Sequence, residues 1–505
     1  MTDLEKKGDS LNSDHDEARV ESQTIDQNHG EALHRVYNIW TATLYQVLMM
    51  ASWTCNVVLY DTVFTVGGPM MLIYSTIIVT LGQCLMMASL GELCSVWPYA
   101  GGQQAFTKYL APNNARRVLS YIIGWIVFLA EVATSAGCAM NNAQLVGGLV
   151  NLTHPDFAIT NWFTWIVYTI FLLLSIPFSM SQKHLPAISV IGGVITLAGF
   201  FAWAVAFLAM APKMSVQFVF TELINSSGYT NVGWVGIMSF YTPVYALYGT
   251  DGILHLAEEM KDPATNAPKA MIWAMLASGA SSLAGAIVLG FTAGNWEQYI
   301  TADSPLIAWW VDTLDSVAGG SALIVLVIIA LNFLIVVSIN TAASRVTWSM
   351  AKDNAFPFSN RLVKINKRLQ TPLNAIFTTI GFQIVIGLVV FGSQNAFQTI
   401  VSLGGVAIQI GYFVPVVLLL LKGRSVLPAD RAYNLGRFGY AINTGAVCWA
   451  ALIITMLCFP LVFPITSSNL LEMNWSIAVF AAAVLLVLVD WIFRARFHYQ
   501  DEISS

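Results

Sequence analysis

Apolar residues occur along this chain in long continuous blocks that are separated by short polar segments. A block of about 20 apolar residues is long enough to cross roughly 30 Å of hydrocarbon as an α-helix. A membrane barrel would instead need alternating strands of about ten residues, and the blocks do not alternate. The pattern predicts an all-α integral membrane protein with twelve transmembrane helices, at residues 41–64, 69–91, 118–146, 162–181, 186–210, 233–256, 270–293, 321–344, 373–392, 396–421, 441–463 and 475–494.

Composition agrees with this fold class. Only 10% of the 505 residues are charged, 56% are hydrophobic, and the mean hydropathy is +0.66. A soluble domain has roughly 25% charged residues, so this balance excludes one. We therefore expect the lipid bilayer and a small molecule as partners, and no nucleic acid. The oligomeric state is left open.

The two ends of the chain differ from the apolar blocks. Residues 1–36 hold nine acids and four bases, which leaves 19 of each in the remainder of the chain. Such a segment buries too little apolar surface to fold. We predict a disordered cytoplasmic tail over residues 1–36, a membrane domain over residues 37–497 and a short cytoplasmic tail over residues 498–505.

Basic residues fix the predicted orientation. With twelve spans and both termini inside, 22 of the 23 lysines and arginines fall in cytoplasmic segments, and only Lys213 falls outside. Cytoplasmic loops of membrane proteins carry an excess of these residues. The chain is expected to be a multi-pass protein, in the plasma membrane, with both termini cytoplasmic.

The sixth span is unusually polar. The sequence "SFYTPVYALYGTDGILHLAEEM" (239–260) places a proline, two glycines, an aspartate and a histidine in or next to one span. Backbone groups freed by a break are tolerated in a membrane only beside protein or water. We predict an unwound stretch at residues 242–248, although an ordinary proline kink is the alternative.

The first span has a matching interruption, "QVLMMASWTCN" (46–56). Interrupted helices at corresponding positions of two halves indicate a transporter site built by inverted repeats. The two halves would be residues 41–210 and 233–421, with extra helices at 441–494. The predicted function is transport across the membrane, with the substrate held beside the two breaks.

Ionisable residues at membrane depth are costly and normally face an internal cavity. Glu131, in "GWIVFLAEVATSAG", is the most isolated acid and the leading candidate for binding substrate and proton. Asp251 and His255 are one helical turn apart and could pair, which makes them further candidates for proton coupling. Each also has a structural interpretation: Glu131 in neutral helix packing, Asp251 as a helix cap, and His255 as a packing residue. Glu258 and Glu259 are expected at the cytoplasmic edge.

Aromatic side chains near the breaks could hold an ammonium group by cation–π attraction. With Asn56 and Glu131, they complete the predicted substrate-binding set, which is Trp53, Asn56, Glu131, Phe240, Tyr241, Tyr245 and Tyr248. Any one ring could instead pack or face lipid.

Other classes of function find little support. Six cysteines lie in or beside spans without a CxxC pair, which favours packing over a metal site. No GxxxxGK[ST] loop is present for an ATP-driven pump, and His255 with Asp251 lacks the nucleophile that a membrane-embedded enzyme needs. We expect neither enzymatic activity nor a cofactor. A channel or a non-transporting nutrient sensor remains open.

Several segments resemble the amino acid/choline transporter family of the amino acid–polyamine–organocation superfamily, which includes fungal GABA and choline permeases. They are "GGPMMLIYSTIIV" (67–79), "GELCSVWPYAGGQ" (91–103), "HLAEEMKDPATNAPKAM" (255–271), "SRVTWSMAKDNAFPFS" (344–359) and "TPLNA" (371–375).

The resemblance implies a LeuT-type fold with five-plus-five inverted repeats and two added helices. It also implies secondary import of choline, GABA or an amino acid, usually with protons, and places Trp53, Glu131, Tyr245 and Asp251 at substrate-facing or gating positions. Two features depart from the family: the segment "LYQVLMMASW" (44–53) lacks glycine, and the span at 186–210 lacks lysine. Glu131 or Asp251 would therefore have to carry the proton.

Overall fold

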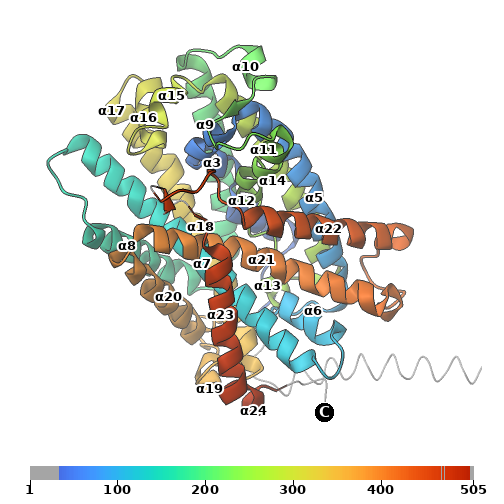
Figure 1. The fold of residues 1–505 in the computed structure, drawn as a ribbon. Coiled ribbons are helices and arrows are strands. Elements are labelled where there is room, and N and C mark those ends of the chain that lie inside the picture. Colours follow the sequence, from blue (N-terminus) through green and yellow to red (C-terminus); the bar gives the residue numbers. More distant parts are fainter. Residues whose placement is uncertain (1–32, 468, 471–472, 501–505) are drawn as a thin grey trace, which may run out of the picture.

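The computed structural model describes residues 33–467, 469–470 and 473–500, and helices make up most of these residues (Figure 1). The predicted acidic tail therefore lies outside the described residues except for its last four positions, and the C-terminal tail is described only to Gln500.

Ten predicted spans coincide with long apolar helical segments. Among the described residues, ten helical segments are long and apolar enough to cross a membrane. They are α5 (Gly68–Val96), α7 (Arg116–Thr153), α8 (Asn161–Ser179), α9 (Leu185–Met210), α14 (Pro263–Phe291), α17 (Val317–Leu323) continuing through η2 (Ile324–Ile329) into α18 (Ala330–Lys352), α20 (Leu373–Gly387) with η3 (Leu388–Phe391), α21 (Gln394–Lys422), η5 (Gly436–Phe438) with α22 (Gly439–Leu457), and α23 (Ser476–Asp490) with η7 (Trp491–Ala495) and α24 (Arg496–His498).

The first and sixth predicted spans are divided into short helices. The first consists of α2 (Ile39–Met50), α3 (Ser52–Val58) and α4 (Tyr60–Thr65), and the sixth consists of α11 (Val232–Met238), α12 (Tyr241–Ala246), α13 (Gly252–His255) and η1 (Ala257–Glu259). Ala51, with a φ of 36°, separates α2 from α3 inside the predicted interruption. Both expected interruptions are therefore confirmed.

The predicted position of the second break, residues 242–248, is wrong over most of its length and agrees with the structure only at residues 247 and 248. Helix α12 includes Pro243 in its first turn, where a backbone N–H has no acceptor within the helix and a proline is tolerated. The chain instead leaves the helix at residues 247–251, where Gly249 has a φ of +73° that favours glycine. The break begins more than one turn later than predicted, because Pro243 lies within α12 and the helix continues to Ala246.

Short elements lie in the connections between the long helices. The two-residue strands β1 (Val66–Gly67) and β2 (Ile224–Asn225) pair antiparallel. The remaining short helices are α6 (Gln103–Leu110), α10 (Val216–Phe220), α15 (Trp296–Tyr299), α16 (Pro305–Thr313), α19 (Ser359–Leu362) and η4 (Arg424–Val426).

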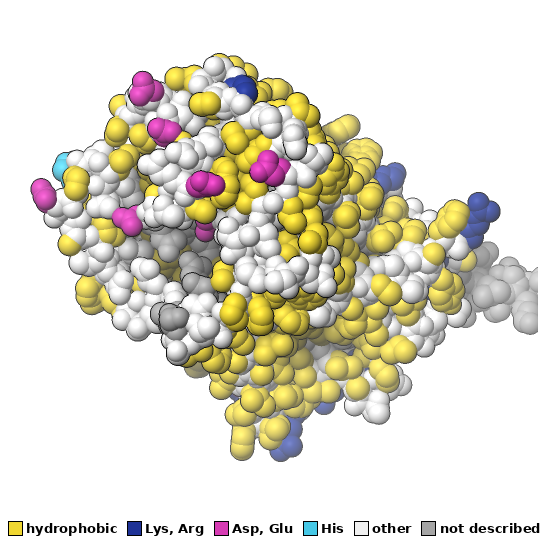
Figure 2. Space-filling model, turned by 45° about the horizontal axis from the view of Figure 1, so that its top comes forward, with side chains coloured by type: hydrophobic (Ala, Val, Ile, Leu, Met, Phe, Trp, Pro, Cys, Tyr) yellow, Lys and Arg dark blue, Asp and Glu magenta, His cyan; other side chains and the backbone are white. Residues whose placement is uncertain are grey.

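The segments predicted to be cytoplasmic meet at one end of the bundle. Lys422 donates to the carbonyl of Tyr109 over 3.0 Å, and Arg494 donates to the carbonyl of Ala355 over 2.6 Å. Acidic side chains predominate on the opposite end, which is tilted toward the viewer in Figure 2, and apolar side chains cover much of the remaining visible surface. The predicted charge asymmetry is thus an asymmetry of the folded molecule.

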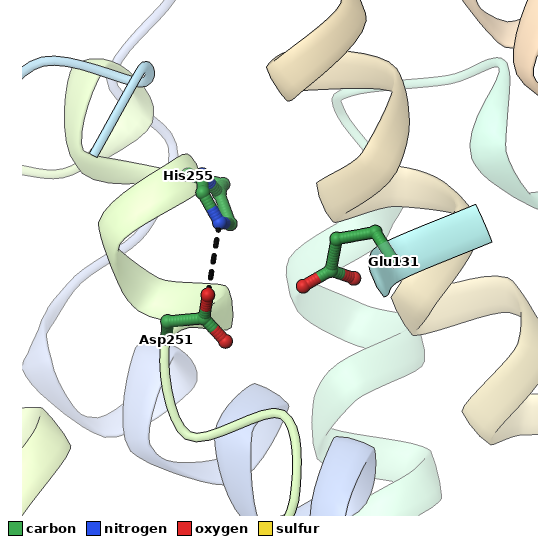
Figure 3. Close-up of side chains that lie close together, drawn as sticks. All are labelled: Glu131, Asp251 and His255. Carbon is green, nitrogen blue, oxygen red and sulfur yellow. Dashed lines mark hydrogen bonds and ion pairs between the residues drawn. The ribbon is translucent and has the colours of Figure 1, made fainter. Parts of the chain in front are cut away.

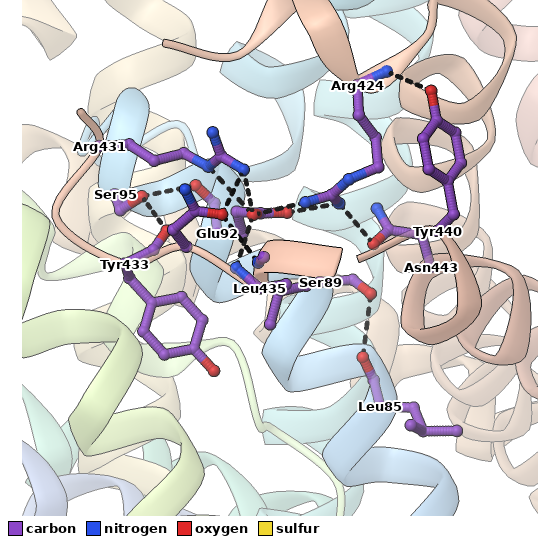
Figure 4. Close-up of polar contacts among 12 residues, drawn as sticks. Leu85, Ser89, Glu92, Ser95, Arg424, Arg431, Tyr433, Leu435, Tyr440 and Asn443 are labelled. Atoms are coloured by element: carbon purple, nitrogen blue, oxygen red, sulfur yellow. Dashed lines mark hydrogen bonds and ion pairs between the residues drawn. The ribbon is translucent and has the colours of Figure 1, made fainter. Parts of the chain in front are cut away.

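A buried acid in the segment 91–103 joins helices at the end of the bundle where the basic residues gather. Glu92, near the end of α5, accepts hydrogen bonds from Arg424 over 2.7 Å and from Arg431 over 2.8 and 3.0 Å (Figure 4). It also accepts from the backbone N–H of Leu435 over 2.9 Å. The carboxylate is fully buried, so this cluster fixes the connection between α21 and α22 onto α5.

Candidate functional site

Helix α7 brings Glu131 into the interior of the bundle. The side chain is only 2% exposed, and its Oε2 atom has no hydrogen-bond partner. In Figure 3 the carboxyl group points from α7 toward Asp251 and His255 on the other side of the site. A buried carboxyl without a partner is costly, which makes Glu131 a candidate functional residue.

Asp251 and His255 lie opposite Glu131, at the second break. Asp251 is the last residue before α13 and His255 is the last residue within it, and both are fully buried. The Nε2 atom of His255 lies 3.2 Å from Oδ2 of Asp251, so the two residues pair as their spacing predicts (Figure 3). One carboxylate oxygen of Glu131, one carboxylate oxygen of Asp251 and one ring nitrogen of His255 all lie within 4.8 Å of one another.

Two side chains that the sequence did not single out hold Asp251 in place. The amide of Gln103 donates to Oδ2 over 2.6 Å, and the hydroxyl of Tyr412 donates to Oδ1 over 2.8 Å. Gln103 is the last residue of the segment 91–103, so the motif itself contained a signal for it. Tyr412 lies within the apolar run of α21, where nothing in the sequence distinguished it.

The hydrogen bonds of His255 fix the charge of the pair. Its Nδ1 atom lies 3.0 Å from the carbonyl oxygen of Ala100, which can only accept, so Nδ1 carries a proton. The contact between Nε2 and Asp251 then requires one more proton, because two facing lone pairs would repel. With that shared proton the pair of Asp251 and His255 is neutral overall. Glu131 is therefore the group of the three whose charge is not settled by a protein partner.

Gln46 of α2 satisfies the backbone that the second break exposes. Its Nε2 donates to the carbonyl of Gly249, and its Oε1 accepts from the N–H of Ile253 over 3.0 Å. Gly252 allows this approach, because a Cβ there would lie 2.4 Å from Sδ of Met49. Gln46 is the first residue of the predicted interruption 46–56 but was not among the predicted site residues. The two broken spans are thus joined directly to each other.

Three tyrosines of the predicted set form a stack next to the break. Ring centroids of Tyr241 and Tyr245 are 4.7 Å apart, and those of Tyr245 and Tyr248 are 5.3 Å apart. The Tyr248 hydroxyl donates to the carbonyl of Gly405 on α21. The tyrosine stack can contribute an aromatic wall, and its part in substrate binding stays a prediction.

The three other residues of the predicted substrate-binding set make contacts with neighbouring helices. Trp53 stacks on Trp203 at 5.3 Å and donates to the carbonyl of Thr196 over 3.2 Å. The Asn56 amide donates to the carbonyl of Ser282 over 2.8 Å. Phe240 packs 5.8 Å from the ring of Trp449. These contacts account for Trp53 and Phe240 without a ligand, whereas Oδ1 of Asn56 is buried without a partner. The role of all three in substrate binding remains a prediction.

Gln409 of α21 was missed by the sequence reasoning. Its Nε2 and Oε1 are both buried and unpartnered, and no other side chain among the described residues has two such atoms. It follows Gly405 by four residues and precedes Tyr412 by three, so all three share one helical face. Since Gly405 contacts Tyr248 and Tyr412 contacts Asp251, this face of α21 looks toward the second break.

A buried ion pair lies between the site and the end of the bundle where the segments predicted to be cytoplasmic meet. Nε of Arg345 lies 2.7 Å from Oε1 of Glu259, and both side chains are at most 1% exposed. The backbone of Tyr37 bonds to Glu259 and Lys261 over 3.0 and 2.9 Å, which ties the start of the first span to the end of the sixth. Glu258 pairs with Lys352 at 3.0 Å. Glu259 is thus buried in a closure and does not lie at an exposed edge.

The unpartnered carboxyl of Glu131 is a group that a small cation could satisfy. An ammonium group could replace the missing protein partner of Glu131, because carboxylates normally accept charge-assisted hydrogen bonds when buried. Carboxylate and imidazole groups can also ligate a metal ion. However, Asp251 and His255 already use their inward atoms on each other and on protein donors, so the cluster fits a proton and an organic cation better than a metal.

Comparison with known proteins adds an independent line of information. A family model described as amino acid permease matches residues 37–483. The choline transporter of Saccharomyces cerevisiae is 29% identical over 446 residues, which cover 87% of this chain and 78% of that protein. An uncharacterized amino-acid permease of Schizosaccharomyces pombe is 26% identical over 485 residues, covering 95% and 89%. Amino-acid permease BAT1 of Arabidopsis thaliana is 26% identical over 473 residues, covering 88% and 89%.

Proposed function

Because the chain belongs to the amino acid permease family, and is therefore a multi-pass membrane transporter and not an enzyme, we propose that it imports a small cationic nitrogen compound by alternating access. In this proposal the ten long segments and the two divided ones form twelve spans, arranged as LeuT-type inverted repeats with two added helices. Both termini face the cytoplasm, which the gathering of basic residues at one end supports. The membrane in this proposal is the plasma membrane.

The observation that carries the proposal is the unpartnered carboxyl of Glu131 beside a neutral Asp251–His255 pair. When Glu131 is ionised, the buried cluster has one uncompensated negative charge. A substrate ammonium or a proton can neutralise it, so the two compete for one carboxylate. This favours choline-like or primary amine cations among the candidate substrates, and it makes the proton gradient the natural driving force.

Substrates differ in what they offer beyond the cationic nitrogen. Choline has a hydroxyl, whereas GABA and amino acids have a carboxylate. Gln409 has an amide whose donor and acceptor are both unused, so it could bind either group. The tyrosine stack next to the break supplies aromatic faces that attract a quaternary ammonium.

Uptake into proteoliposomes tests the proposal. Labelled choline is offered with or without an inward proton gradient, and GABA and several amino acids are added as competitors. Wild type should accumulate at least one of these compounds, and a protonophore should abolish the accumulation. A Glu131→Gln variant should lose roughly thirtyfold or more in uptake, because removing one partner of a buried charge pair costs about 2 kcal/mol or more.

Two control variants separate the possible failures. Glu131→Asp keeps the charge and should retain part of the uptake, while Glu297→Gln removes an exposed acid far from the site and should have no effect. Uptake by Glu131→Gln with unchanged rate and pH dependence would show that the residue assignment is wrong. Binding of a compound by folded wild-type protein without uptake would instead identify a sensor.

A further inference from the structure

A groove of about 710 Å³ lies on the outside of the bundle, away from the site around Glu131. It is lined by residues of α7, α19, α20 and α23. The last three of these elements lie in the lower half of the molecule in Figure 1. Leu486 and Phe377 on its rim are 72% and 51% exposed. Its volume falls in the range of roughly 300–1,000 Å³ that is typical of small-molecule sites.

The groove is polar at one end and apolar at the other. Asn374 near the start of α20 and Asp490 at the end of α23 lie at the basic end of the bundle. Leu129, Phe382 and Ala483 line the part farther from that end. Ala483 and Asp490 are seven residues apart on α23, so the groove extends about 10 Å along the helix. This gradient matches a molecule with a polar head and an apolar chain.

The polar end carries one excess positive charge. Arg494 is paired with Asp490 at 2.5 Å and also donates to the carbonyl of Ala355. Arg361 lines the same end, but no carboxylate among the described residues lies within ion-pair distance of it. Its guanidinium instead lies 5.8 Å from the ring centroid of Phe358. The end of the groove therefore offers one exposed guanidinium to an anion.

We propose that this groove binds one anionic glycerophospholipid, with its phosphate at Arg361 and part of an acyl chain along Phe377 and Leu486. A phosphodiester carries the single negative charge that the polar end lacks, and a guanidinium is well suited to bind it. The apolar end is open to the surface that faces hydrocarbon, where each buried methylene group contributes to retention. Basic pockets at this level of a helical bundle bind anionic headgroups by the same chemistry.

Lipid retention measured by native mass spectrometry tests this site. Purified protein is exchanged into detergent containing equal amounts of phosphatidylglycerol and phosphatidylcholine with identical chains. Wild type should retain one phosphatidylglycerol in preference to phosphatidylcholine, and Arg361→Gln should lose about fivefold of that retention, the factor that corresponds to about 1 kcal/mol per basic residue. Arg368→Gln is the matched control, because Arg368 lies in the same connection but does not line the groove.

A second variant tests the apolar end without changing charge. Thr378→Trp fills part of the groove and should reduce retention of both lipids, while size-exclusion chromatography confirms that the variant is folded. Equal retention by wild type and Arg361→Gln would overturn the proposal, as would an equal loss in Arg368→Gln. An increase of several-fold in retention after deletion of residues 1–32 would also overturn it, because it would identify that acidic segment as the occupant.

Discussion

Replacing Gln46 with leucine tests whether the second break is held open by the first span. Leucine keeps most of the volume but removes both hydrogen bonds, leaving the carbonyl of Gly249 and the N–H of Ile253 without partners. Each buried backbone group left unsatisfied costs about 1–3 kcal/mol. We therefore expect a loss of about 2–6 kcal/mol in the free energy that keeps the broken span in this conformation, which is a large part of the stability of a typical protein.

The loss can be read from thermal unfolding of purified protein in detergent, followed by the fluorescence of its many tryptophans. Gln46→Leu should lower the apparent melting temperature clearly. Gln409→Leu is the matched control: it removes the same chemical group from a buried helix, but that group has no partner to lose. If Gln46→Leu melts at the wild-type temperature, or no lower than Gln409→Leu, Gln46 does not support the break.

Three further outcomes follow from the structure. Gln409→Leu should keep the wild-type melting temperature but weaken apparent substrate affinity in uptake assays; unchanged affinity would exclude the amide from the site. Glu259→Gln should leave Arg345 without its ion-pair partner and loosen the closure. A cysteine placed at the buried Ala257, in a cysteine-free background, should then react faster with an impermeant thiol reagent. Equal labelling rates would contradict this. Glu92→Gln should reduce the free energy of unfolding by about 3–5 kcal/mol, because it leaves two arginines unpaired. The apparent affinity for substrate should not change. A loss of substrate affinity at constant stability would assign Glu92 to the substrate site instead.

The sequence predicted the features that depend on local pattern. Long apolar runs gave the helices of the ten continuous spans, and polar interruptions located both broken spans. Glu131 stood out because no other acid is so deep within an apolar block. The spacing of Asp251 and His255 predicted their pairing, since residues four apart share a helical face.

The remaining features depend on contacts between distant segments. Gln46 and Gly249 are 203 positions apart, and Tyr412 and Asp251 are 161 positions apart. No periodicity within one helix can show that such residues meet. The exact break was also misplaced, because the effect of Pro243 depends on where α12 begins. Trp53 shows the same dependence: its position beside the interruption was visible in the sequence, but its packing on Trp203 was not, because the two residues are far apart in the chain.

The candidate site is formed by two groups of helices, the two broken spans and the helices around α7. This division matters for how transport would be driven. Gln46 ties α2 to the second break, and Tyr37 ties the same span to Glu259, so the two broken spans are linked at both the break and the closure. Glu131, in contrast, is carried by α7, which packs on α18 and α21. In the proposed function, movement of the broken spans would separate Asp251 from Glu131 and from Tyr412 of α21, and so change the surroundings of the Glu131 carboxyl. A cation bound between them is therefore sensitive to the relative position of the two groups, and this sensitivity is what a carrier needs to link binding to alternating access.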